Sequence, residues 1–535
     1  MRLTEKSIQD VALWRAAGFA LPAYNREAVR AATKQNPTWV HFGAGNIFRA
    51  FPAMLQQRLL NKGRADTGII VAEGYDYEII DLVNRPHDDL SLLVTLKADG
   101  SIEKTVVGSV VESLKADSAD TAQFARLQEI FAAPSLQIAS FTITEKGYSL
   151  IRADGSLLPD VEKDFAAGPA APASYIGKLA ALLYHRWQNG ARPLALTSMD
   201  NCSHNGTRLF EAVHAFAAQW AAAGHVPAGF AAWVQDPARL SFPWSMIDKI
   251  TPRPDEGVRD MLRAAGFEDA EGKVTAKNTY VAPFVNAEET QYLVIEDAFP
   301  NGRPPLEEAG VLFTSRETVD RVEKMKVCTC LNPLHTALAV FGCLLGYQKI
   351  SDEMQDDDLV RLIKRVGYGE GLPVVVDPGI LSPAEFIDTV INLRFPNPFM
   401  PDTPQRIATD TSQKMAVRFG ETIKAYMARA DLDVQSLTAI PLVQAAWCRY
   451  LLGVDDTGNP FELSPDPLLV QLQPLFAGVT LGQPCDAHAV LAPLLGNAAI
   501  FGVDLYAAGL GQKVEEYFTA MIQAPGSVRE TLGRL

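Results

Sequence analysis

The sequence has few cysteines, few histidines and no pattern that would join them into a metal site. Six cysteines are spread over 535 residues, which is too sparse for the disulfide framework of a small secreted domain. The eight histidines and these cysteines form no cluster with the spacing of zinc ligands. Cys328 and Cys330 stand as an isolated pair, and we expect two reduced, buried thiols there. We therefore predict no metal.

The sequence also lacks a long hydrophobic run and an excess of basic residues. The longest apolar stretch, "TALAVFGCLLGY" (336–347), is short enough to be a buried helix rather than a membrane span. No apolar run followed by a cleavage site opens the chain. The 48 basic and 63 acidic residues give a net charge of −15, so neither nucleic acid nor an anionic membrane is an expected partner. We expect a soluble, cytoplasmic protein.

The remaining composition predicts a large folded protein with at least two domains. Hydrophobic residues make up 48% of the chain and charged residues 21%, as in ordinary globular proteins. The Pro/Gly-rich "FPNGRPP" (299–305) is the expected boundary between residues 1–305 and 306–535. Helical patterns dominate beyond it, at 318–347, 383–393, 412–430 and 437–452.

Residues 1–305 carry the pattern of a doubly wound α/β fold behind an N-terminal extension. A β-branched and aromatic run at 39–42 leads into Gly43-x-Gly45 and then a helical pattern. Near-continuous apolar runs at 67–76, 136–144 and 193–199 are typical of parallel strands buried on both faces. The order of strand, glycine turn and helix is the opening unit of a Rossmann-like dinucleotide-binding domain.

The glycine turn by itself also fits an ordinary tight turn. Phe48 stands where a third glycine is usual, and the acidic position follows Gly43 by thirty residues rather than about twenty. The context favours a pyrophosphate site, in which Asn46 and Arg49 could supply further donors. Glu73 and Asp76, at the end of the second strand, could bind the adenosine ribose. No arginine lies next to them in the sequence, which favours NAD over NADP.

Six separated motifs resemble the polyol-specific long-chain dehydrogenases, which include mannitol 2-dehydrogenase, fructuronate reductase and tagaturonate reductase. The motifs are "HFGAGNIFRA" (41–50), "TITEKGY" (142–148), "TSMDNCSHNG" (197–206), "FPWSMIDKITP" (242–252), "EKMKVCTCLNPLH" (323–335) and "RFPNPFMPDTPQRIATDTSQKM" (394–415). The resemblance covers residues 38–450. It implies a dinucleotide-binding domain before a mainly helical domain, and catalysis without metal.

The resemblance also implies that a lysine acts as the acid/base catalyst. Glu323 and Lys326 match the family's Glu-x-x-Lys. Oxidising a secondary alcohol requires a group that accepts the hydroxyl proton, and no zinc ion is expected here to acidify the alcohol. An amine in an apolar pocket beside a nicotinamide cation can have its pKa lowered to roughly 7–8.

Other matched positions imply a complete site around that lysine. Asn201, Asn332 and His335 would supply donors to the developing alkoxide or a neighbouring hydroxyl. Asp248, Arg406 and Lys414 match positions that contact the polyol chain in the family, and two cations would also suit a carboxylate. Each residue has a simpler interpretation, such as a helix-edge lysine, a cap asparagine, a core histidine or a surface ion pair. The set is persuasive because its members occur together.

One departure from the family predicts a local irregularity. Six positions separate Lys326 from Asn332, whereas five are usual in the family. One extra residue rotates the subsequent part of a helix by about 100° unless a π-bulge absorbs it. We therefore predict a π-bulge or a break between Val327 and Leu331.

The motif "TEKGY" looks like the fructuronate reductase branch, which interconverts D-fructuronate and D-mannonate. Lys146 in this motif could contact substrate or cofactor, or could only brace the turn. Mannitol 2-dehydrogenase and tagaturonate reductase remain alternatives within the family, and a non-catalytic nucleotide-binding protein is the alternative from another class. The sequence shows no heptad repeat, so a monomer is the default expectation.

Overall fold

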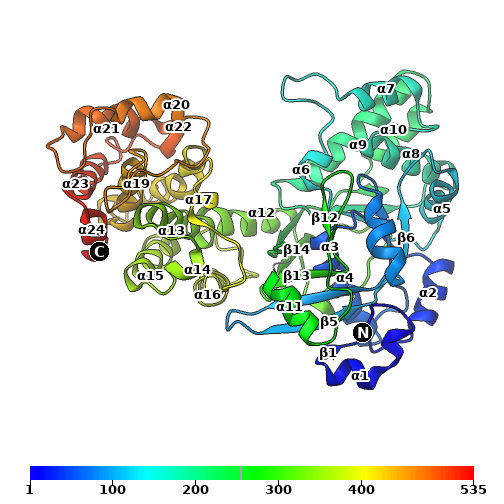
Figure 1. Ribbon diagram of the computed structural model, residues 1–535. Coiled ribbons are helices and arrows are strands. Elements are labelled where there is room, and N and C mark those ends of the chain that lie inside the picture. Colours follow the sequence, from blue (N-terminus) through cyan, green and yellow to red (C-terminus); the bar gives the residue numbers. More distant parts are fainter. Residues whose placement is uncertain (254–255) are drawn as a thin grey trace. The chain divides into compact units, whose positions relative to one another are not determined.

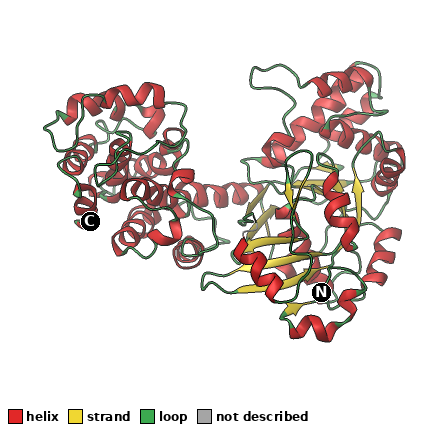
Figure 2. Ribbon diagram, viewed as in Figure 1, coloured by secondary structure: helices red, strands yellow, loops and turns green. Residues whose placement is uncertain are grey.

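A computed structural model describes residues 1–253 and 256–535 of the chain. The described residues divide into two compact units, drawn as ribbons in Figure 1. The first unit holds residues 1–97 and 101–320, and the second holds residues 98–100 and 321–535. The strands belong to the first unit, and helices build the second (Figure 2).

The centre of the first unit is a parallel sheet in the order β6–β3–β2–β7–β8–β9. Its strands are β2 (Trp39–Phe42), β3 (Ile69–Glu73), β6 (Val110–Lys115), β7 (Ile138–Phe141), β8 (Leu194–Ser198) and β9 (Leu240–Ser241). The chain enters at β2, proceeds outward through β3 and β6, and then returns to the other side of β2 at β7. This order confirms the predicted doubly wound fold and places a crevice between the ends of β2 and β7.

Helices cover both faces of this sheet, which is why its strands read as continuous apolar runs. The glycine turn is followed by α3 (Asn46–Ala50) and α4 (Pro52–Asn61), whose apolar side chains pack on one face. The opposite face is covered by α5 (Thr121–Ala132), α8 (Tyr175–Gln188) and α9 (Asn205–Ala222). The helical pattern after the turn was predicted, but the structure interrupts it at Phe51, before Pro52.

Smaller sheets flank the central one and were not predicted from the sequence. One has the order β1–β5–β4–β13 and another the order β10–β14–β15. Their strands and the hairpin β11–β12 are β1 (Phe19–Ala20), β4 (Ser91–Leu96), β5 (Ile102–Val107), β10 (Ser245–Asp248), β11 (Lys273–Val274), β12 (Tyr280–Val281), β13 (Phe284–Glu288), β14 (Tyr292–Glu296) and β15 (Leu312–Thr314). The remaining helices of this unit include α1 (Val11–Ala16), α2 (Arg26–Gln35), α6 (Thr144–Gly147), α7 (Pro159–Ala167), α10 (Ala228–Gln235) and α11 (Glu256–Ala264).

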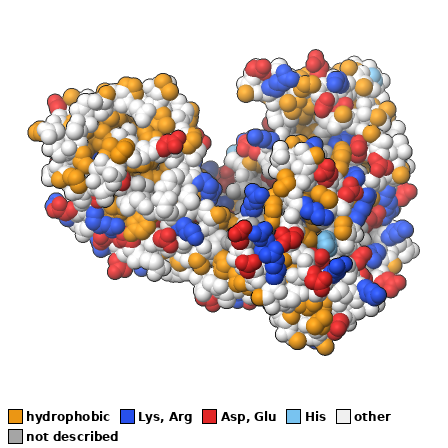
Figure 3. Space-filling model, in the orientation of Figure 1, with side chains coloured by type: hydrophobic (Ala, Val, Ile, Leu, Met, Phe, Trp, Pro, Cys, Tyr) orange, Lys and Arg blue, Asp and Glu red, His pale blue; other side chains and the backbone are white. Residues whose placement is uncertain are grey.

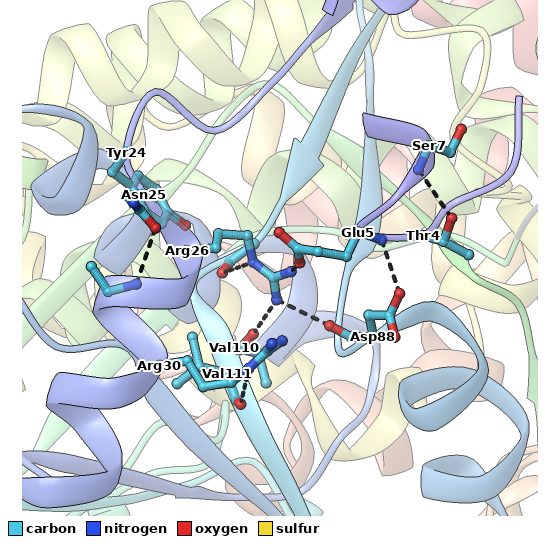
Figure 4. Close-up of polar contacts among 12 residues, drawn as sticks. Thr4, Glu5, Ser7, Tyr24, Asn25, Arg26, Arg30, Asp88, Val110 and Val111 are labelled. Carbon is cyan, nitrogen blue, oxygen red and sulfur yellow. Dashed lines mark hydrogen bonds and ion pairs between the residues drawn. The ribbon is translucent and has the colours of Figure 1, made fainter. Parts of the chain in front are cut away.

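A buried arginine is among the contacts that hold the N-terminal extension against the rest of the first unit (Figure 4). The Arg26 guanidinium donates to the carbonyls of Gly108 (2.9 Å), Val110 (3.1 Å) and Asp88 (3.0 Å). It also pairs with the carboxylate of Glu5. These partners come from three separate parts of the chain, so a single side chain ties the extension to the edge strand of the central sheet.

The second unit contains the larger part of one long, mostly buried helical segment. That segment comprises α12 (Arg316–Met325), which begins in the first unit, a π-helical turn η5 (Lys326–Cys330) and α13 (Asn332–Leu345). Its part α13 packs directly against five of the other helices, which are α14 (Ile350–Glu353), α15 (Asp357–Lys364), α17 (Pro404–Ile407), α19 (Ala439–Tyr450) and α24 (Ser527–Gly533). The remaining helices of this unit include α16 (Pro383–Thr389), α18 (Glu421–Ala428), α20 (Leu469–Leu472), α21 (Ala487–Leu495), α22 (Ala498–Phe501) and α23 (Gly511–Met521).

The segment Arg316–Leu345 is long and apolar enough to cross a membrane by length and composition. The core helix of a globular protein passes the same test, and 78% of its most apolar window is buried inside the structure. We therefore assign it to the protein core.

On the face drawn in Figure 3, Lys and Arg side chains alternate with Asp and Glu side chains over the first unit.

Candidate active site

A cavity of about 830 Å³ opens at the carboxyl ends of the central strands in the first unit. Gly43 and Gly45 line it from the turn after β2, and residues 73–77 line it from the end of β3. The "TITEKGY" segment, residues 158–161 at the start of α7, the first turn of α8 and Lys277 also line it. The cavity therefore lies at the crevice that the strand order predicts for a dinucleotide.

The two glycines of the turn have different roles. Gly43 has a φ of +105°, and a Cβ added there would lie 2.4 Å from the Thr142 carbonyl oxygen. Both observations require glycine at this position. A Cβ added at Gly45 would meet nothing within 4 Å, so the turn leaves open space toward the cavity. A phosphate group could approach the backbone closely there, and the site fits a dinucleotide.

The Glu73 carboxylate braces this turn. It accepts hydrogen bonds from the backbone N–H groups of Ala44 (2.8 Å), Tyr75 (2.8 Å) and Asp76 (3.1 Å). Asp76 accepts a hydrogen bond from the Thr275 hydroxyl through Oδ2 at 2.7 Å. Both acids line the cavity, as the ribose prediction requires. Glu73 is engaged by three backbone donors, so Asp76 is the better placed of the two to accept from a ribose hydroxyl.

Asn46 and Arg49 are engaged with each other and with the protein backbone. Arg49 donates from Nη1 to the Ala282 carbonyl (2.7 Å) and from Nη2 to Oδ1 of Asn46 (2.9 Å). Its side chain is buried, and burial lowers the pKa of Arg49 to about 10. These contacts hold α3 against the segment between β12 and β13. A role of either side chain as a phosphate donor stays a prediction.

The "TITEKGY" turn is shaped by Asp200, which sequence reasoning missed. Asp200 accepts from the backbone N–H groups of Ile143 and Thr144, both at 2.9 Å, and from the Tyr148 hydroxyl at 2.5 Å. Thr144 has a φ of +63°, a conformation that costs free energy unless the surroundings hold it. Asp200 thereby presents Lys146 at the cavity wall. Burial raises the pKa of Asp200, although its three donors oppose that effect.

Two further lysines line the cavity near the end of β3. Lys178 donates to the Gly74 carbonyl (2.8 Å) and to the Tyr77 hydroxyl (3.0 Å), and burial lowers the pKa of Lys178 to about 8. Lys277 donates to the Tyr75 carbonyl (2.7 Å), and its Nζ lies 3.9 Å from the centroid of the Tyr75 ring. Neither lysine is near Glu73 in the sequence, so no local pattern could have revealed this pair.

In the second unit, Lys326 is buried and its exposed fraction is 5%. It is the first residue of the π-helical turn η5, in which the Leu331 N–H donates to the Lys326 carbonyl at 3.1 Å. Leu331 then leaves helical geometry, with φ −127° and ψ −62°, before α13 begins at Asn332. The π-bulge predicted between Val327 and Leu331 is confirmed. The additional residue is absorbed by this π-helical turn and by the non-helical Leu331.

His335 lies on the first turn of α13 beside Asp402, which the sequence did not single out. Its Nε2 is 3.4 Å from Oδ2 of Asp402, and its ring centroid is 5.0 Å from that of Phe395. Burial lowers the pKa of His335, and Asp402 acts in the opposite direction. Asp402 also pairs with the Arg406 guanidinium. The carboxylate therefore joins the predicted histidine to the predicted arginine.

A second polar chain joins the Asn332 carbonyl to Arg418, another residue that was not predicted. The Thr336 hydroxyl donates to the Asn332 carbonyl at 3.0 Å and accepts from the Arg418 guanidinium. Burial lowers the pKa of Arg418 to about 10. Lys414 donates to the Thr409 carbonyl, and burial, followed by the nearby charge of Arg418, lowers the pKa of Lys414. The second unit thus gathers several cations near Asn332 and His335.

The other two predicted residues belong to the first unit. Asn201 follows the end of β8 and is exposed, whereas Asp248 ends β10 and is buried. Both make polar interactions within the structure.

Comparison with known proteins identifies the two units. Residues 37–308 match the Mannitol dehydrogenase Rossmann domain, and residues 318–522 match the Mannitol dehydrogenase C-terminal domain. The chain belongs to the mannitol dehydrogenase family. The family resemblance inferred from the sequence motifs is therefore confirmed.

Within the mannitol dehydrogenase family, the chain is 52% identical to a D-mannonate oxidoreductase of Thermotoga maritima, over 99% of this chain and 98% of that protein. It is 30% identical to a mannitol 2-dehydrogenase of Cereibacter sphaeroides, over 84% and 87% of the two chains. The fold matches a crystal structure of D-sorbitol dehydrogenase in substrate-free form with a TM-score of 0.78, 25% identity and coverage of 99% and 100%. It also matches the Pseudomonas fluorescens mannitol 2-dehydrogenase ternary complex with NAD and D-mannitol, with a TM-score of 0.68, 27% identity and coverage of 100% and 99%.

Proposed function

We propose that this protein is an NAD-dependent oxidoreductase that interconverts D-mannonate and D-fructuronate. The observation that carries the proposal is the 52% identity, over nearly the full length of both chains, to a protein named D-mannonate oxidoreductase. The mannitol 2-dehydrogenases of the same family are more distant, at 30–31% identity. This difference favours a sugar acid over a polyol as the substrate.

The cavity of the first unit is the proposed NAD site. Gly43 and Gly45 would admit the pyrophosphate, and the free oxygen of the Asp76 carboxylate would accept from a ribose hydroxyl. A carboxylate at that position disfavours the additional phosphate of NADP, although Lys178 and Lys277 reduce the local negative charge. Bound NAD supplies the hydride acceptor at its nicotinamide ring.

Lys326 is the proposed proton carrier. When hydride leaves the hydroxyl-bearing carbon of D-mannonate, the hydroxyl proton passes to the uncharged Lys326 amine. In the direction of D-fructuronate reduction, the Lys326 ammonium returns a proton to the new alkoxide. The amine is placed in a buried π-helical turn, which limits competition from water for the reacting oxygen.

Asn201, Asn332 and His335 are the proposed donors to the reacting oxygen and its neighbouring hydroxyl groups. Asp248 is proposed to accept from a substrate hydroxyl. Arg406 and Lys414 are proposed to bind the carboxylate, a group that planar guanidinium donors suit particularly well. Arg406 and Lys414 cluster with Arg418 in the second unit. A bound negative charge would offset the electrostatic repulsion among these cations, so the cluster supports an anionic substrate.

A panel of substrates tests this proposal. NADH consumption is measured with D-fructuronate, D-fructose and D-tagaturonate under the same conditions, and we expect the highest kcat/KM with D-fructuronate. A higher kcat/KM with D-fructose or D-tagaturonate would instead assign mannitol 2-dehydrogenase or tagaturonate reductase activity. If NADH binds but no sugar is reduced, the protein is a non-catalytic nucleotide-binding member of the family.

The proposal includes a place of action and an assembly. We propose that the protein works in the cytoplasm as a monomer. Free thiols at all six cysteines are compatible with a reducing compartment. Size-exclusion chromatography with light scattering at micromolar concentration tests the monomer, and a mass near 58.2 kDa is expected.

A further inference from the structure

A chain of buried polar side chains runs along β2 and β7 to the wall of the dinucleotide cavity. Trp39 Nε1 donates to the Ser140 hydroxyl at 2.7 Å. The same hydroxyl lies 2.6 Å from Nδ1 of His41, and Nε2 of His41 lies 2.9 Å from the Thr142 hydroxyl. Trp39, His41 and Ser140 are completely buried. These polar groups lie in two strands of the central sheet that are buried along their whole length, and burial of polar groups is costly unless each is satisfied.

His41 is held as a neutral ring in this chain. Its imidazole stacks on Phe48, with centroids 4.0 Å apart and planes 8° from parallel. Burial lowers the pKa of His41 well below its usual value. A neutral imidazole carries one N–H donor and one nitrogen acceptor, so the hydrogen-bond chain has a direction.

The positions of the hydrogen atoms in this hydrogen-bond chain follow from its first donor, the Trp39 indole. The indole N–H of Trp39 can only donate, so Ser140 accepts from it and has one hydroxyl hydrogen left to place. Among the described residues, the Ser140 hydroxyl contacts Trp39 and His41. Donation from Ser140 to Nδ1 places the ring proton on Nε2, which then donates to Thr142. The opposite tautomer would leave the Ser140 hydrogen without an acceptor in a completely buried position.

In this arrangement the Thr142 hydroxyl accepts from His41 and keeps its own hydrogen to donate. Thr142 lines the cavity. Its Oγ1 would lie only 3.2 Å from a Cβ added at Gly43, which places the hydroxyl directly beside the glycine turn. A hydroxyl that already accepts from the protein interior presents a donor to whatever occupies the space by that turn.

We infer that the Thr142 hydroxyl donates a hydrogen bond to an anionic diphosphate oxygen of the bound dinucleotide, and that His41 positions Thr142 for this contact. The inference rests on the NAD-binding part of the proposed function and is independent of the sugar substrate. Diphosphate oxygens accept and do not donate, so they match a hydroxyl that has only a donor to offer. His41 acts through Thr142 and does not itself touch the dinucleotide.

Binding of ADP-ribose and adenosine to purified full-length variants tests this inference. Thr142→Val removes the hydroxyl, Thr142→Ser retains it, and His41→Phe keeps a ring against Phe48 without nitrogen atoms. A hydrogen bond to a charged group adds substantially to binding affinity. Thr142→Val, which loses it, should therefore weaken ADP-ribose binding by about ten- to hundredfold. Thr142→Ser should remain within about threefold of the wild type, and His41→Phe should lie between the two. Adenosine has no phosphate, so its binding should be unchanged.

Each alternative outcome is decisive. Wild-type affinity of Thr142→Val for ADP-ribose, or equal weakening for adenosine and ADP-ribose, would overturn the diphosphate contact. Failure of the wild type itself to bind ADP-ribose would overturn both this inference and the NAD site, whereas failure to reduce D-fructuronate would affect only the proposed substrate. NMR spectra of ¹⁵N-labelled histidine provide a second readout, in which His41 is expected as the Nε2–H tautomer. An Nδ1–H tautomer would contradict the positioning role.

Discussion

At the scale of single residues, the site depends on side chains that are buried and yet polar. Lys326 and His335 lie inside the helical unit, and Glu73 lies beneath the glycine turn. Glu73 accepts from three backbone N–H groups, and the Asp402 carboxylate lies 3.4 Å from Nε2 of His335. An unsatisfied polar group in the interior costs about 1–3 kcal/mol. Function therefore rests on partners as much as on the residues that touch the ligands.

Gly43→Ala tests the glycine turn most directly at this scale. The added Cβ would lie 2.4 Å from the Thr142 carbonyl oxygen, on a backbone with φ +105°. We expect the free energy of unfolding to fall by about 1–3 kcal/mol and NADH to bind more weakly. Thermal unfolding and fluorescence titration with NADH measure the two effects. Gly45→Ala is the matched control, because its Cβ would enter open space and should leave the unfolding temperature unchanged.

Asp402→Asn tests the electrostatic role of its carboxylate. Burial lowers the pKa of His335, and the negative charge of Asp402 opposes that effect. Removing the charge should lower the pKa of His335 further. If substrate binding needs the neutral imidazole, activity is lost as the pH falls through this pKa, so the acidic limb of the kcat/KM profile should move to lower pH. A shift of the limb to higher pH would contradict the assigned charges.

At the scale of elements, two turns from distant parts of the sequence are built as one structure. Asp200, after β8, holds the turn after β7 through two backbone N–H groups and the Tyr148 hydroxyl. An amide at position 200 keeps one acceptor and loses the charge that strengthens these bonds. Asp200→Asn should therefore loosen the "TITEKGY" turn and raise the KM for NAD several-fold.

The control for this prediction is Glu162→Gln, which changes an exposed carboxylate on nearby α7. Steady-state kinetics with both variants separate a specific effect of Asp200 from a general loss of negative charge. Equal KM values for NAD in Asp200→Asn and in the wild type would show that the turn does not depend on this carboxylate.

The elements also show what a sequence can and cannot reveal. β2, β3, β7 and β8 were predictable because burial on both faces leaves continuous apolar runs, whereas β6 and β9 were not predicted. The π-turn was predictable because one extra residue separates Lys326 from Asn332. The flanking sheets were not predicted, since β4 pairs with β13 across about 190 residues and no local pattern records that pairing. Lys178, Lys277, Asp402 and Arg418 were missed for the same reason. Lys178 and Lys277 reach the cavity of the first unit, and Asp402 and Arg418 reach their partners within the second unit, only when each unit is folded.

At the scale of the whole molecule, the N-terminal extension contributes to stability through Arg26. Its guanidinium donates to three carbonyls and pairs with Glu5 while its exposed fraction is 4%. Arg26→Met leaves these acceptors without a donor and should lower the free energy of unfolding by about 3 kcal/mol. Urea denaturation measures this loss. Arg15→Met, on the exposed side of α1, should change stability by less than about 0.5 kcal/mol.

Metal independence is a prediction about the molecule as a whole. Within residues 1–253 and 256–535, no group of three or more His, Cys, Asp or Glu side chains could hold a metal ion. If the Lys326 amine carries the proton, dialysis against EDTA should leave kcat with D-fructuronate and NADH unchanged. Loss of activity that returns on adding Zn²⁺ would contradict this account.

The central claim is that the buried amine of Lys326 carries the proton of the reaction. The measurement is kcat for D-fructuronate reduction by Lys326→Ala, alongside the NADH dissociation constant and the exposed control Lys324→Ala. We predict that Lys326→Ala loses about 10²–10⁴-fold in kcat while NADH binding and the activity of Lys324→Ala stay near wild-type values. A kcat within tenfold of the wild type for Lys326→Ala would contradict the account.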